Sequence, residues 1–317
     1  MGERLIFMGT PRFAVPSLER LQEEYEVVAV VTRPDRAAGR GRRVAFSLVK
    51  EEALAWGIPV KQPRSLKKEE VVASLLELEP QAIVVAAYGQ ILPPEVLDIP
   101  PFGCLNVHAS LLPKHRGASP VAGALLAGEE ETGITIMLME EKMDTGPILA
   151  QARLPIAPED NRGSLTERLA YLGADLLLET LPHWLKGEVA PQPQEDDRAT
   201  YTRILRKEDG LIDWNMTSVE IWRQVRAYNP WPSAYTDFEG RPLRILRARP
   251  IKGKRGEPGL VVATKEGAAV AAGEGLLALE EVQLAGKRAM GVAEFLRGQR
   301  GFVGSRLGQA HTSISRR

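Results

Sequence analysis

Cysteine is almost absent from this chain of 317 residues, since Cys104 is the only one. A single thiol excludes an intramolecular disulfide, and it cannot supply the cluster of thiolates on which many zinc sites depend. Because Cys104 falls within a predicted strand, we expect a buried and inert side chain rather than a nucleophile. Disulfide-stapled folds and thiolate metal centres are therefore excluded.

Long apolar runs are also missing. No stretch approaches the roughly 18 apolar residues that a membrane-spanning helix needs. The first eight residues are interrupted by Gly9 too soon to form a signal peptide. We therefore expect a cytoplasmic protein. With 44% apolar and 26% charged residues, the composition is that of a globular protein, and the length allows two domains.

The net charge is zero, but it is unevenly distributed. Residues 210–317 contain 17 lysines and arginines against 10 acidic residues, so the preceding part of the chain has an acidic excess. A basic last third suggests a module that binds a polyanion, although solvated surface side chains would give the same count. The glycine fingerprint of dinucleotide-binding folds is missing, because Gly9 stands alone, which disfavours a nicotinamide-dependent dehydrogenase.

Apolar runs alternate with amphipathic ones over the first 185 residues. Several of the runs are rich in β-branched residues, as the central strands of a parallel sheet are. Strands that alternate with helices predict an α/β fold with a mostly parallel, Rossmann-like sheet. The predicted strands are residues 4–8, 27–31, 59–62, 82–87, 103–108, 133–139 and 148–153, and the predicted helices are 15–21, 47–56, 67–77, 119–126 and 165–185.

The pattern changes beyond residue 190. Prolines and charges at residues 190–197 predict a linker, and short apolar segments separated by glycines follow it. Such short strands are typical of a small barrel. We therefore expect a first domain at residues 1–189, a linker at 190–209 and a β-barrel domain at 210–317.

The most informative stretch is the strand predicted at residues 103–108. Side chains alternate along a strand, so Asn106 and His108 share one face while Leu105 and Val107 share the other. Ligands of open α/β sheets bind beyond the carboxyl ends of the strands. An amide and an imidazole at such an end predict a polar site there, although the two side chains could instead form a structural polar pair.

Two neighbouring segments suggest a site at the same place. Pro113 biases Leu112 towards extended backbone, so we expect the backbone groups of residues 110–113 to be unpaired and available to a ligand. Asp144 follows another buried strand in the sequence Asp-Thr-Gly-Pro. An aspartate there is often only a turn former, but its position at the same sheet edge favours a catalytic role.

The motif Asn-x-His-x-Ser-Leu-Leu-Pro-x-x-Arg-Gly at residues 106–117, followed by Asp-x-Gly at 144–146, resembles the signature of the formyltransferases that use 10-formyltetrahydrofolate. Residues 7–13, 207–214 and 226–234 are similar to the same family, and the resemblance covers nearly the whole chain. It implies an OB-like barrel, 10-formyltetrahydrofolate as co-substrate and no metal. It implies that the catalytic residues are Asn106, His108 and Asp144, and that the folate contacts are Ser110, Leu111, Leu112, Pro113, Gln90, Ile91 and Leu92.

Residues 33–43 contain five arginines and one aspartate among glycine, alanine and proline, which predicts a mobile, strongly basic loop. It could be only a solvated connection, but arginine forks spaced by glycines suit phosphate backbones. The tRNA-specific members of the family have a similar Pro-Asp-Arg-x-x-Gly-Arg-Gly loop that reaches the acceptor stem, whereas the sugar-nucleotide formyltransferases lack it. The resemblance therefore implies that the residues in contact with tRNA are Arg36, Arg40, Arg42 and Arg43.

The activity that the resemblance implies is transfer of a formyl group to the α-amino group of methionyl initiator tRNA, for translation initiation, by a monomer. The amine attacks the formyl carbon, and Asn106 would donate to the developing oxyanion. His108 would donate as imidazolium or return a proton to the leaving nitrogen, its reference pKa being about 6.5. A nearby Asp144 would raise that pKa and orient the ring.

Three alternatives remain open. Within the fold, the enzyme could formylate an amino sugar nucleotide instead of tRNA. A hydrolase could use Ser110, His108 and Asp144, but the chain lacks the Gly-x-Ser-x-Gly elbow that such enzymes use. A non-catalytic RNA-binding protein would explain the basic segments but not the polar strand end.

Overall fold

The structure is a computed structural model that describes residues 2–38, 43–253 and 256–308. The chain divides into two compact units. The first consists of Met1–Pro120, Glu130–Ile156 and Leu165–Arg203, and the second of Val121–Glu129, Ala157–Ser164 and Ile204–Arg317.

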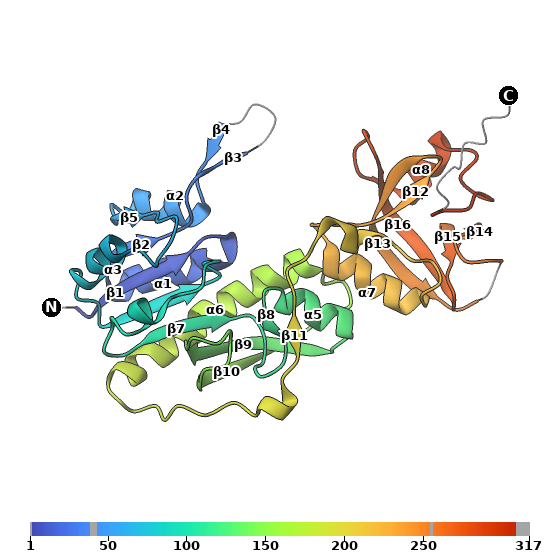
Figure 1. Ribbon diagram of the computed structural model, residues 1–317. Helices are drawn as coiled ribbons and strands as arrows, with labels where there is room; N and C mark the ends of the chain where they lie inside the picture. Colours follow the sequence, from blue (N-terminus) through green and yellow to red (C-terminus); the bar gives the residue numbers. More distant parts are fainter. Residues whose placement is uncertain (1, 39–42, 254–255, 309–317) are drawn as a thin grey trace. The chain divides into compact units, whose positions relative to one another are not determined.

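The first unit is built on a seven-stranded sheet with the order β10-β9-β7-β6-β1-β2-β5 (Figure 1). The pairs from β7 to β5 are parallel, whereas β7–β9 and β9–β10 are antiparallel. The predicted α/β fold with a mostly parallel sheet is therefore confirmed. The strands are β1 (Arg4–Gly9), β2 (Glu26–Val31), β5 (Val60–Lys61), β6 (Ala82–Ala86), β7 (Cys104–His108), β9 (Glu131–Leu138) and β10 (Ile148–Pro155).

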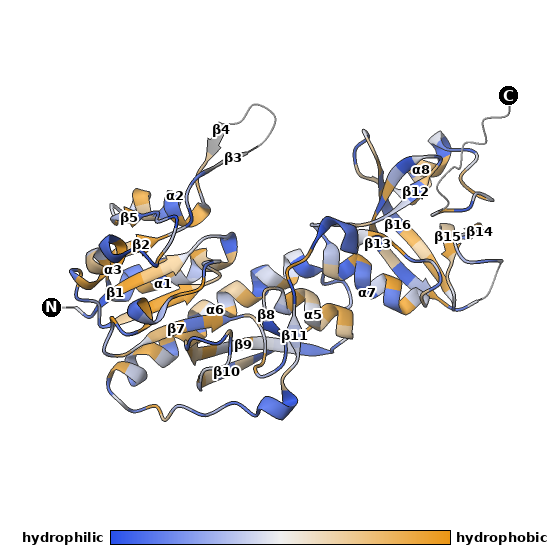
Figure 2. Cartoon of the chain, in the orientation of Figure 1, coloured by the Kyte–Doolittle hydropathy of each residue, from blue (hydrophilic) through white to orange (hydrophobic). Residues whose placement is uncertain are grey.

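The central strands of this sheet are apolar on both faces. Every residue of β6 is buried, and so are the six middle residues of β9. Figure 2 shows the same pattern, with hydrophobic strands and helices that carry both hydrophobic and hydrophilic residues. The helices in this part of the chain are η1 (Arg12–Ala14), α1 (Val15–Glu24), α2 (Leu48–Ala55), α3 (Glu69–Leu76), α4 (Pro94–Leu97), α5 (Pro120–Ala127) and α6 (Arg162–Leu185).

Helix α6 packs closely against β7. A Cβ atom added at Gly173 of α6 would lie 2.8 Å from Cγ1 of Val107, which is closer than real Cβ contacts come. Only glycine lets the helix approach the strand to this distance. The apolar face of β7 is therefore occupied by α6, and this leaves the face of Asn106 and His108 for the site.

The described part of the basic segment is a hairpin stem and not the loop that the sequence predicted. Strand β3 (Arg36–Ala38) pairs antiparallel with β4 (Arg43–Ala45) and projects away from the sheet (Figure 1). Backbone hydrogen bonds hold such a ladder whether or not apolar residues alternate, which is why the pattern of residues did not indicate it. Arg40 and Arg42 lie outside the described residues. We call residues 35–45 the basic arm.

Residues 190–203, which we call the strap, are hydrogen-bonded along their length to the first unit. The strap passes β10, where Gln192 forms a backbone bridge with Ile148, and then contains η2 (Asp196–Arg198). It ends in β11 (Tyr201–Thr202), which lies parallel to β8 (Arg116–Gly117) (Figure 1). This proline- and charge-rich segment is thus an ordered part of the first unit.

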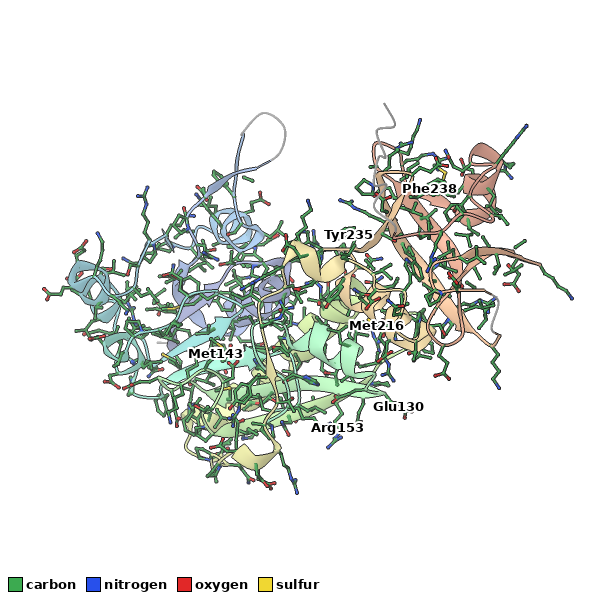
Figure 3. The ribbon with its side chains drawn as sticks, turned by 45° about the vertical axis from the view of Figure 1, so that its right-hand side comes forward. Glu130, Met143, Arg153, Met216, Tyr235 and Phe238 are labelled. Atoms are coloured by element: carbon green, nitrogen blue, oxygen red, sulfur yellow. The ribbon has the colours of Figure 1, made fainter. Side chains whose placement is uncertain are left out.

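The second unit contains an antiparallel sheet with the order β12-β13-β16-β15-β14, and β17 pairs with β16. Its core includes three phenylalanines packed edge to face, among them Phe238 of β12 (Figure 3). The predicted β-rich second domain is confirmed. Its elements are η3 (Lys207–Gly210), α7 (Ser218–Tyr228), β12 (Ala234–Phe238), β13 (Arg241–Ile251), β14 (Val261–Thr264), β15 (Gly267–Ala271), β16 (Leu276–Leu284), β17 (Met290–Gly291) and α8 (Val292–Gly298).

Candidate active site

The carboxyl end of β7 presents two polar side chains on one face. Register with the neighbouring strands places Asn106 opposite Val85 of β6 and Met137 of β9, and His108 opposite Thr135. Asn106 is half-buried, and His108 is only 6% exposed. The predicted strand with Asn106 and His108 on one face is therefore present. It is an inner strand of the sheet, between β6 and β9.

The two ring nitrogens of His108 have different neighbours. Nε2 lies 3.3 Å from the backbone oxygen of His115, and because a carbonyl oxygen can only accept, Nε2 carries the proton of this hydrogen bond. Nδ1 lies 3.7 Å from Oδ1 of Asp144. In the neutral ring Nδ1 therefore carries the free electron pair, and it is the nitrogen that takes up a proton beside the carboxylate.

Asp144 is placed by its backbone and by a second hydrogen bond. Its φ of 55° lies in the left-handed region, which is uncommon for a residue other than glycine. Oδ2 accepts a hydrogen bond of 2.7 Å from the backbone N–H of Gly117. Two residues further along the same turn, Gly146 must be glycine, because an added Cβ would lie 1.9 Å from the backbone oxygen of Leu138. The structure thus brings Asp144 to His108, from a separate part of the chain.

Burial is the largest influence on His108 and lowers the pKa of its imidazole below the usual value. The charge of Asp144 and the hydrogen bond to His115 act in the opposite direction. The sequence led us to expect Asp144 to raise this pKa, and the carboxylate does act in that sense, but burial outweighs it. Burial therefore favours the neutral ring at pH 7, which suits the second of the two expected roles, the return of a proton to the leaving nitrogen.

The prediction of free backbone groups at residues 110–113 is wrong. The hydroxyl of Thr135 donates to the oxygen of Ser110 at 2.7 Å and accepts from the N–H of Leu112 at 3.1 Å. The amide of Gln151 donates to the oxygen of Leu112 at 2.9 Å. Strands β9 and β10 thus supply side chains that occupy these groups. Ser110 and Leu112 are buried and Leu111 and Pro113 are half-buried, so a ligand would meet mainly the side chains of Leu111 and Pro113 here.

The hydroxyl of Ser110 has no link to His108. Its Oγ donates to the backbone oxygen of Lys114 at 2.6 Å, while His108 contacts His115 and Asp144. A nucleophilic serine needs the histidine within hydrogen-bond reach. The arrangement therefore contradicts the hydrolase alternative.

The bend after β6 combines one anchored and one exposed apolar residue. Leu92 is 3% exposed, whereas Ile91 is 70% exposed. The amide of Gln90 donates to the hydroxyl of Tyr88 and to the oxygen of Pro63, both at 3.2 Å. Met143, beside Asp144, is a second exposed apolar side chain (Figure 3). Such exposed apolar groups are suited to contact with a flat ring.

The root of the basic arm is a compact polar cluster. Nζ of Lys50 contacts Oδ2 of Asp35 at 2.6 Å and Oε1 of Gln62 at 2.8 Å. The amide nitrogen of Gln62 donates to Oδ1 of Asp35 and to the oxygen of Arg33, both at 2.8 Å. The bonds from Lys50 and Gln62 lower the pKa of Asp35. Of the arginines assigned to tRNA, Arg36 and Arg43 belong to strands β3 and β4.

Sequence reasoning missed the residues that brace the site. Two of them are Thr135 and Gln151, already described. The other two are Arg116 of β8 and Gln194 of the strap, which are hydrogen-bonded to each other. Arg116 is part of the motif at residues 106–117, and this position could have drawn attention to it. Its side chain is 1% exposed, which is rare for an arginine without a partner. Gln194 lies in a proline-rich segment without periodicity, and no pattern of residues indicates it.

The described residues contain neither a cluster of metal-binding side chains nor a membrane-spanning helix. Within residues 2–38, 43–253 and 256–308, no three His, Cys, Asp or Glu side chains gather as a metal site would need. Among the described helices, none combines the length and the apolar character that crossing a membrane requires.

Comparison with known proteins gives one family. Residues 3–181 match the formyl transferase family model, and residues 204–300 match the model of the formyl transferase C-terminal domain. A methionyl-tRNA formyltransferase of Roseiflexus sp. (strain RS-1) is 51% identical over 99% of this chain and 98% of its own length. Another, of Geobacter sulfurreducens, is 46% identical over 98% of each chain.

Two solved structures with this fold are more distant in sequence. WlaRD, a sugar 3N-formyl transferase, has a TM-score of 0.68 at 19% identity, over 91% of this chain and all of that one. HypX from Aquifex aeolicus in complex with tetrahydrofolic acid has a TM-score of 0.63 at 19% identity, over 96% of this chain. The match covers 49% of HypX, so the chain spans about half the length of that protein. At such identities the likeness supports the fold alone.

Proposed function

The chain belongs to the methionyl-tRNA formyltransferases, and on that premise we propose that Asn106, His108 and Asp144 carry out its reaction. The enzyme transfers the formyl group of 10-formyltetrahydrofolate to the α-amino group of methionyl initiator tRNA. The observation that carries the assignment of residues is the contact of 3.7 Å between Nδ1 of the buried His108 and Asp144.

Acyl transfer between nitrogens begins with attack of the methionyl amine on the formyl carbon. The carbonyl oxygen becomes an oxyanion, and the attacking nitrogen gains a positive charge. Asn106 is half-buried on the same face of β7 as His108, and its amide N–H is a donor for the oxyanion. A donor held on a strand before the reaction needs little reorganisation when the charge develops.

His108 moves the proton that the reaction must relocate. The neutral ring accepts a proton at Nδ1 from the attacking nitrogen and then delivers it to N10 of the folate, so that the bond between N10 and the formyl carbon breaks with a neutral leaving group. The ring ends neutral, as it began. Asp144 stabilises the imidazolium of the intermediate, because Nδ1 is the nitrogen nearest to its carboxylate.

The donor and the acceptor contact different segments. The exposed Ile91, the buried Leu92 beside it and residues 110–113 line the folate, together with Gln90. The basic arm contacts the acceptor stem through Arg36, Arg40, Arg42 and Arg43. Residues 1–189 act as the catalytic domain, 190–209 as its connection, and 210–317 as a further tRNA-binding module, which their basic excess favours. The enzyme acts as a cytoplasmic monomer.

Formylation of an amino sugar nucleotide is the weaker alternative. The sugar formyltransferases among the solved structures are only about a fifth identical to this chain, whereas the methionyl-tRNA formyltransferases reach 51% over nearly the full length. The arginine-rich segment at residues 33–43 also favours a polyanionic acceptor.

A direct assay separates the two acceptors. The purified chain is incubated with 10-formyltetrahydrofolate and either methionyl initiator tRNA, the same tRNA uncharged, or a nucleotide-linked amino sugar. We expect formylation of the charged tRNA alone, and a rate that falls steeply between low and physiological salt, because phosphate contacts release counterions. Formylation of the sugar without formylation of the tRNA would reverse the assignment.

A further inference from the structure

The contact between His108 and Asp144 lacks a hydrogen bond of its own. At 3.7 Å the two atoms are beyond hydrogen-bond distance, so their interaction is electrostatic and varies with the separation. No local bond between the partners holds this separation. The hydrogen bond from the N–H of Gly117 to Oδ2 orients the carboxylate, and the backbone that carries Asp144 sets its position, which depends on whatever fixes the turn at residues 144–146.

One side chain of the strap bonds to that turn at both of its ends, Asp144 and Gly146. The amide nitrogen of Gln194 donates to the backbone oxygen of Asp144 at 2.9 Å and to that of Gly146 at 2.7 Å. Both protons of the amide are thereby used on the turn. Because Asp144 has a positive φ, its backbone adopts a conformation that a free turn would seldom hold.

The other end of the same amide is held by a buried cation. Oε1 of Gln194 accepts from Nε and Nη2 of Arg116 at 3.1 and 2.8 Å, which is a two-pronged contact. The guanidinium also bonds to Asp196 at 2.7 Å and to the hydroxyl of Tyr201 at 3.2 Å, both on the strap. Arg116 is 1% exposed, so this fork has little freedom. Gln194 is therefore fixed at its oxygen while its nitrogen holds the turn.

The strap also bonds to the segment around His115, which contacts the Nε2 side of the His108 ring. The hydroxyl of Thr200 accepts from the N–H of His115 at 2.8 Å, and the oxygen of His115 is the partner of Nε2 of His108. The hydroxyl of Thr202 accepts from Ser119 and donates to Arg116. Both neighbours of the His108 ring thus depend on residues far away in the sequence.

We propose that Gln194 is a positioning residue for formyl transfer: its side-chain amide joins the buried Arg116 to the turn at residues 144–146 and so sets the distance between Asp144 and His108. The inference rests on the proposed roles of His108 and Asp144. It extends the catalytic apparatus to the strap, a segment that composition alone marks as a linker.

Two substitutions separate the two ends of the amide. Gln194→Ala removes all four hydrogen bonds, whereas Gln194→Glu keeps the oxygen that accepts from Arg116 and loses both donors to the turn. We expect kcat for tRNA formylation to fall about tenfold or more in both, because small misplacements of a catalytic group cost up to about 10²-fold. The KM values for tRNA and folate should stay within about twofold. A Gln194→Glu enzyme with the wild-type kcat would overturn the proposal.

A double-mutant cycle tests whether Gln194 acts through Asp144. Gln194→Ala is introduced into the wild type and into Asp144→Asn, and kcat is measured well below the Tm of each variant. In the Asp144→Asn background the second change should cost less than about twofold, since coupled residues are not additive. Costs that multiply would show a general structural role and overturn the inference.

The control and the proposed function are tested in the same set. Gln192→Ala changes a glutamine of the same strap whose bonds to Ile148 come from its backbone, so kcat should be unchanged. If Asp144→Asn has the wild-type rate, the proposed catalytic assignment fails. If Asp144→Asn is impaired but the Gln194 variants are not, only the present inference fails.

Discussion

The candidate active site and the root of the basic arm hold their polar side chains at different degrees of burial. In the site, His108 and Arg116 are 6% and 1% exposed, and side chains from distant segments hold the groups around them. In the arm, fixed contacts are found at the root, where Asp35, Lys50 and Gln62 meet. Chemistry needs a defined geometry, whereas contact with phosphates needs positive charge within reach. Changes in the site should therefore alter kcat, and changes in the arm should alter KM and its salt dependence.

Two histidine–carboxylate pairs show the same contrast within one unit. His183 and Glu188 form an exposed pair with 2.6 Å between Nδ1 and Oε2, and the hydrogen bond lowers the pKa of Glu188. His108 and Asp144 are farther apart but buried, and there burial governs the pKa of the histidine. The two pairs therefore differ in burial as well as in distance. The exposed pair thus provides a matched control for the buried one.

The largest effect is expected at His108. His108→Ala removes the group that takes the proton from the amine and returns it to the folate nitrogen, so kcat should fall by roughly 10³-fold or more. His183→Ala, which removes a histidine from the exposed pair, should leave kcat unchanged. Single-turnover formylation of methionyl initiator tRNA measures both. A His108→Ala enzyme with a near-normal rate would remove the distinction between the buried and the exposed pair.

Loss of Asn106 should cost somewhat less. Asn106→Ala removes one proposed oxyanion donor, and loss of one such donor typically lowers kcat by about 10²–10³-fold. Folate binding should change little, because the oxyanion exists only during the reaction. Steady-state kinetics with both substrates, together with direct measurement of folate binding, check this. Near wild-type turnover would exclude the oxyanion role and leave Asn106 as a structural residue of β7.

Asp144→Asn sharpens the electrostatic side of the comparison. Burial lowers the pKa of His108 and the carboxylate opposes it, so removing the negative charge should lower that pKa further. Since the neutral ring is the active form, activity rises with pH as His108 loses its proton. This acid limb of the pH–rate profile should therefore move to lower pH, and kcat on the plateau should fall by about 10-fold or more because the imidazolium intermediate loses its counter-charge. An unmoved profile with a normal rate would make Asp144 a turn residue only.

How much of the site could be predicted depends on the range of the interactions involved. Asn106 and His108 follow from the period of a strand, and that strand is where it was expected. The roles of Thr135 and Gln151 were not foreseeable, because each bonds to backbone groups of residues 110–112, which the sequence reads as free. Their effect requires knowledge of which strands are neighbours.

The same distinction applies to the strap and the arm. Proline and charge at residues 190–197 correctly indicate the absence of regular structure over most of the segment, but they do not reveal that Gln194 bonds to a turn far away in the sequence. The stem of the arm escaped prediction because Arg36–Ala38 and Arg43–Ala45 are held by backbone pairing without apolar alternation. Periodicity detects elements with a repeating apolar pattern, and neither of these segments has one.

The smallest effect is expected at the root of the arm. Gln62→Ala removes two donors, to Asp35 and to the oxygen of Arg33, and one acceptor from Lys50, while the contact between Lys50 and Asp35 remains. The arm would keep its charge but lose part of its fixed direction, so binding of tRNA would have to order it. We expect KM for tRNA to rise about threefold, within the cost of ordering a few side chains.

Three other kinetic quantities show whether Gln62 only orients the basic arm or supports the structure in general. They are kcat, the rate of folate hydrolysis and the salt dependence of KM. After Gln62→Ala, kcat should be unchanged, because the site at β7 does not involve Gln62. We expect the same site to hydrolyse 10-formyltetrahydrofolate slowly in the absence of tRNA, and this rate should also be unchanged. The dependence of KM on salt should keep its slope, since no phosphate contact has been lost. Gln22→Ala on α1 is a control with the same residue type outside the cluster. A lower rate of folate hydrolysis in Gln62→Ala would mean that the root also supports the catalytic site, and the separation between the two regions would then fail.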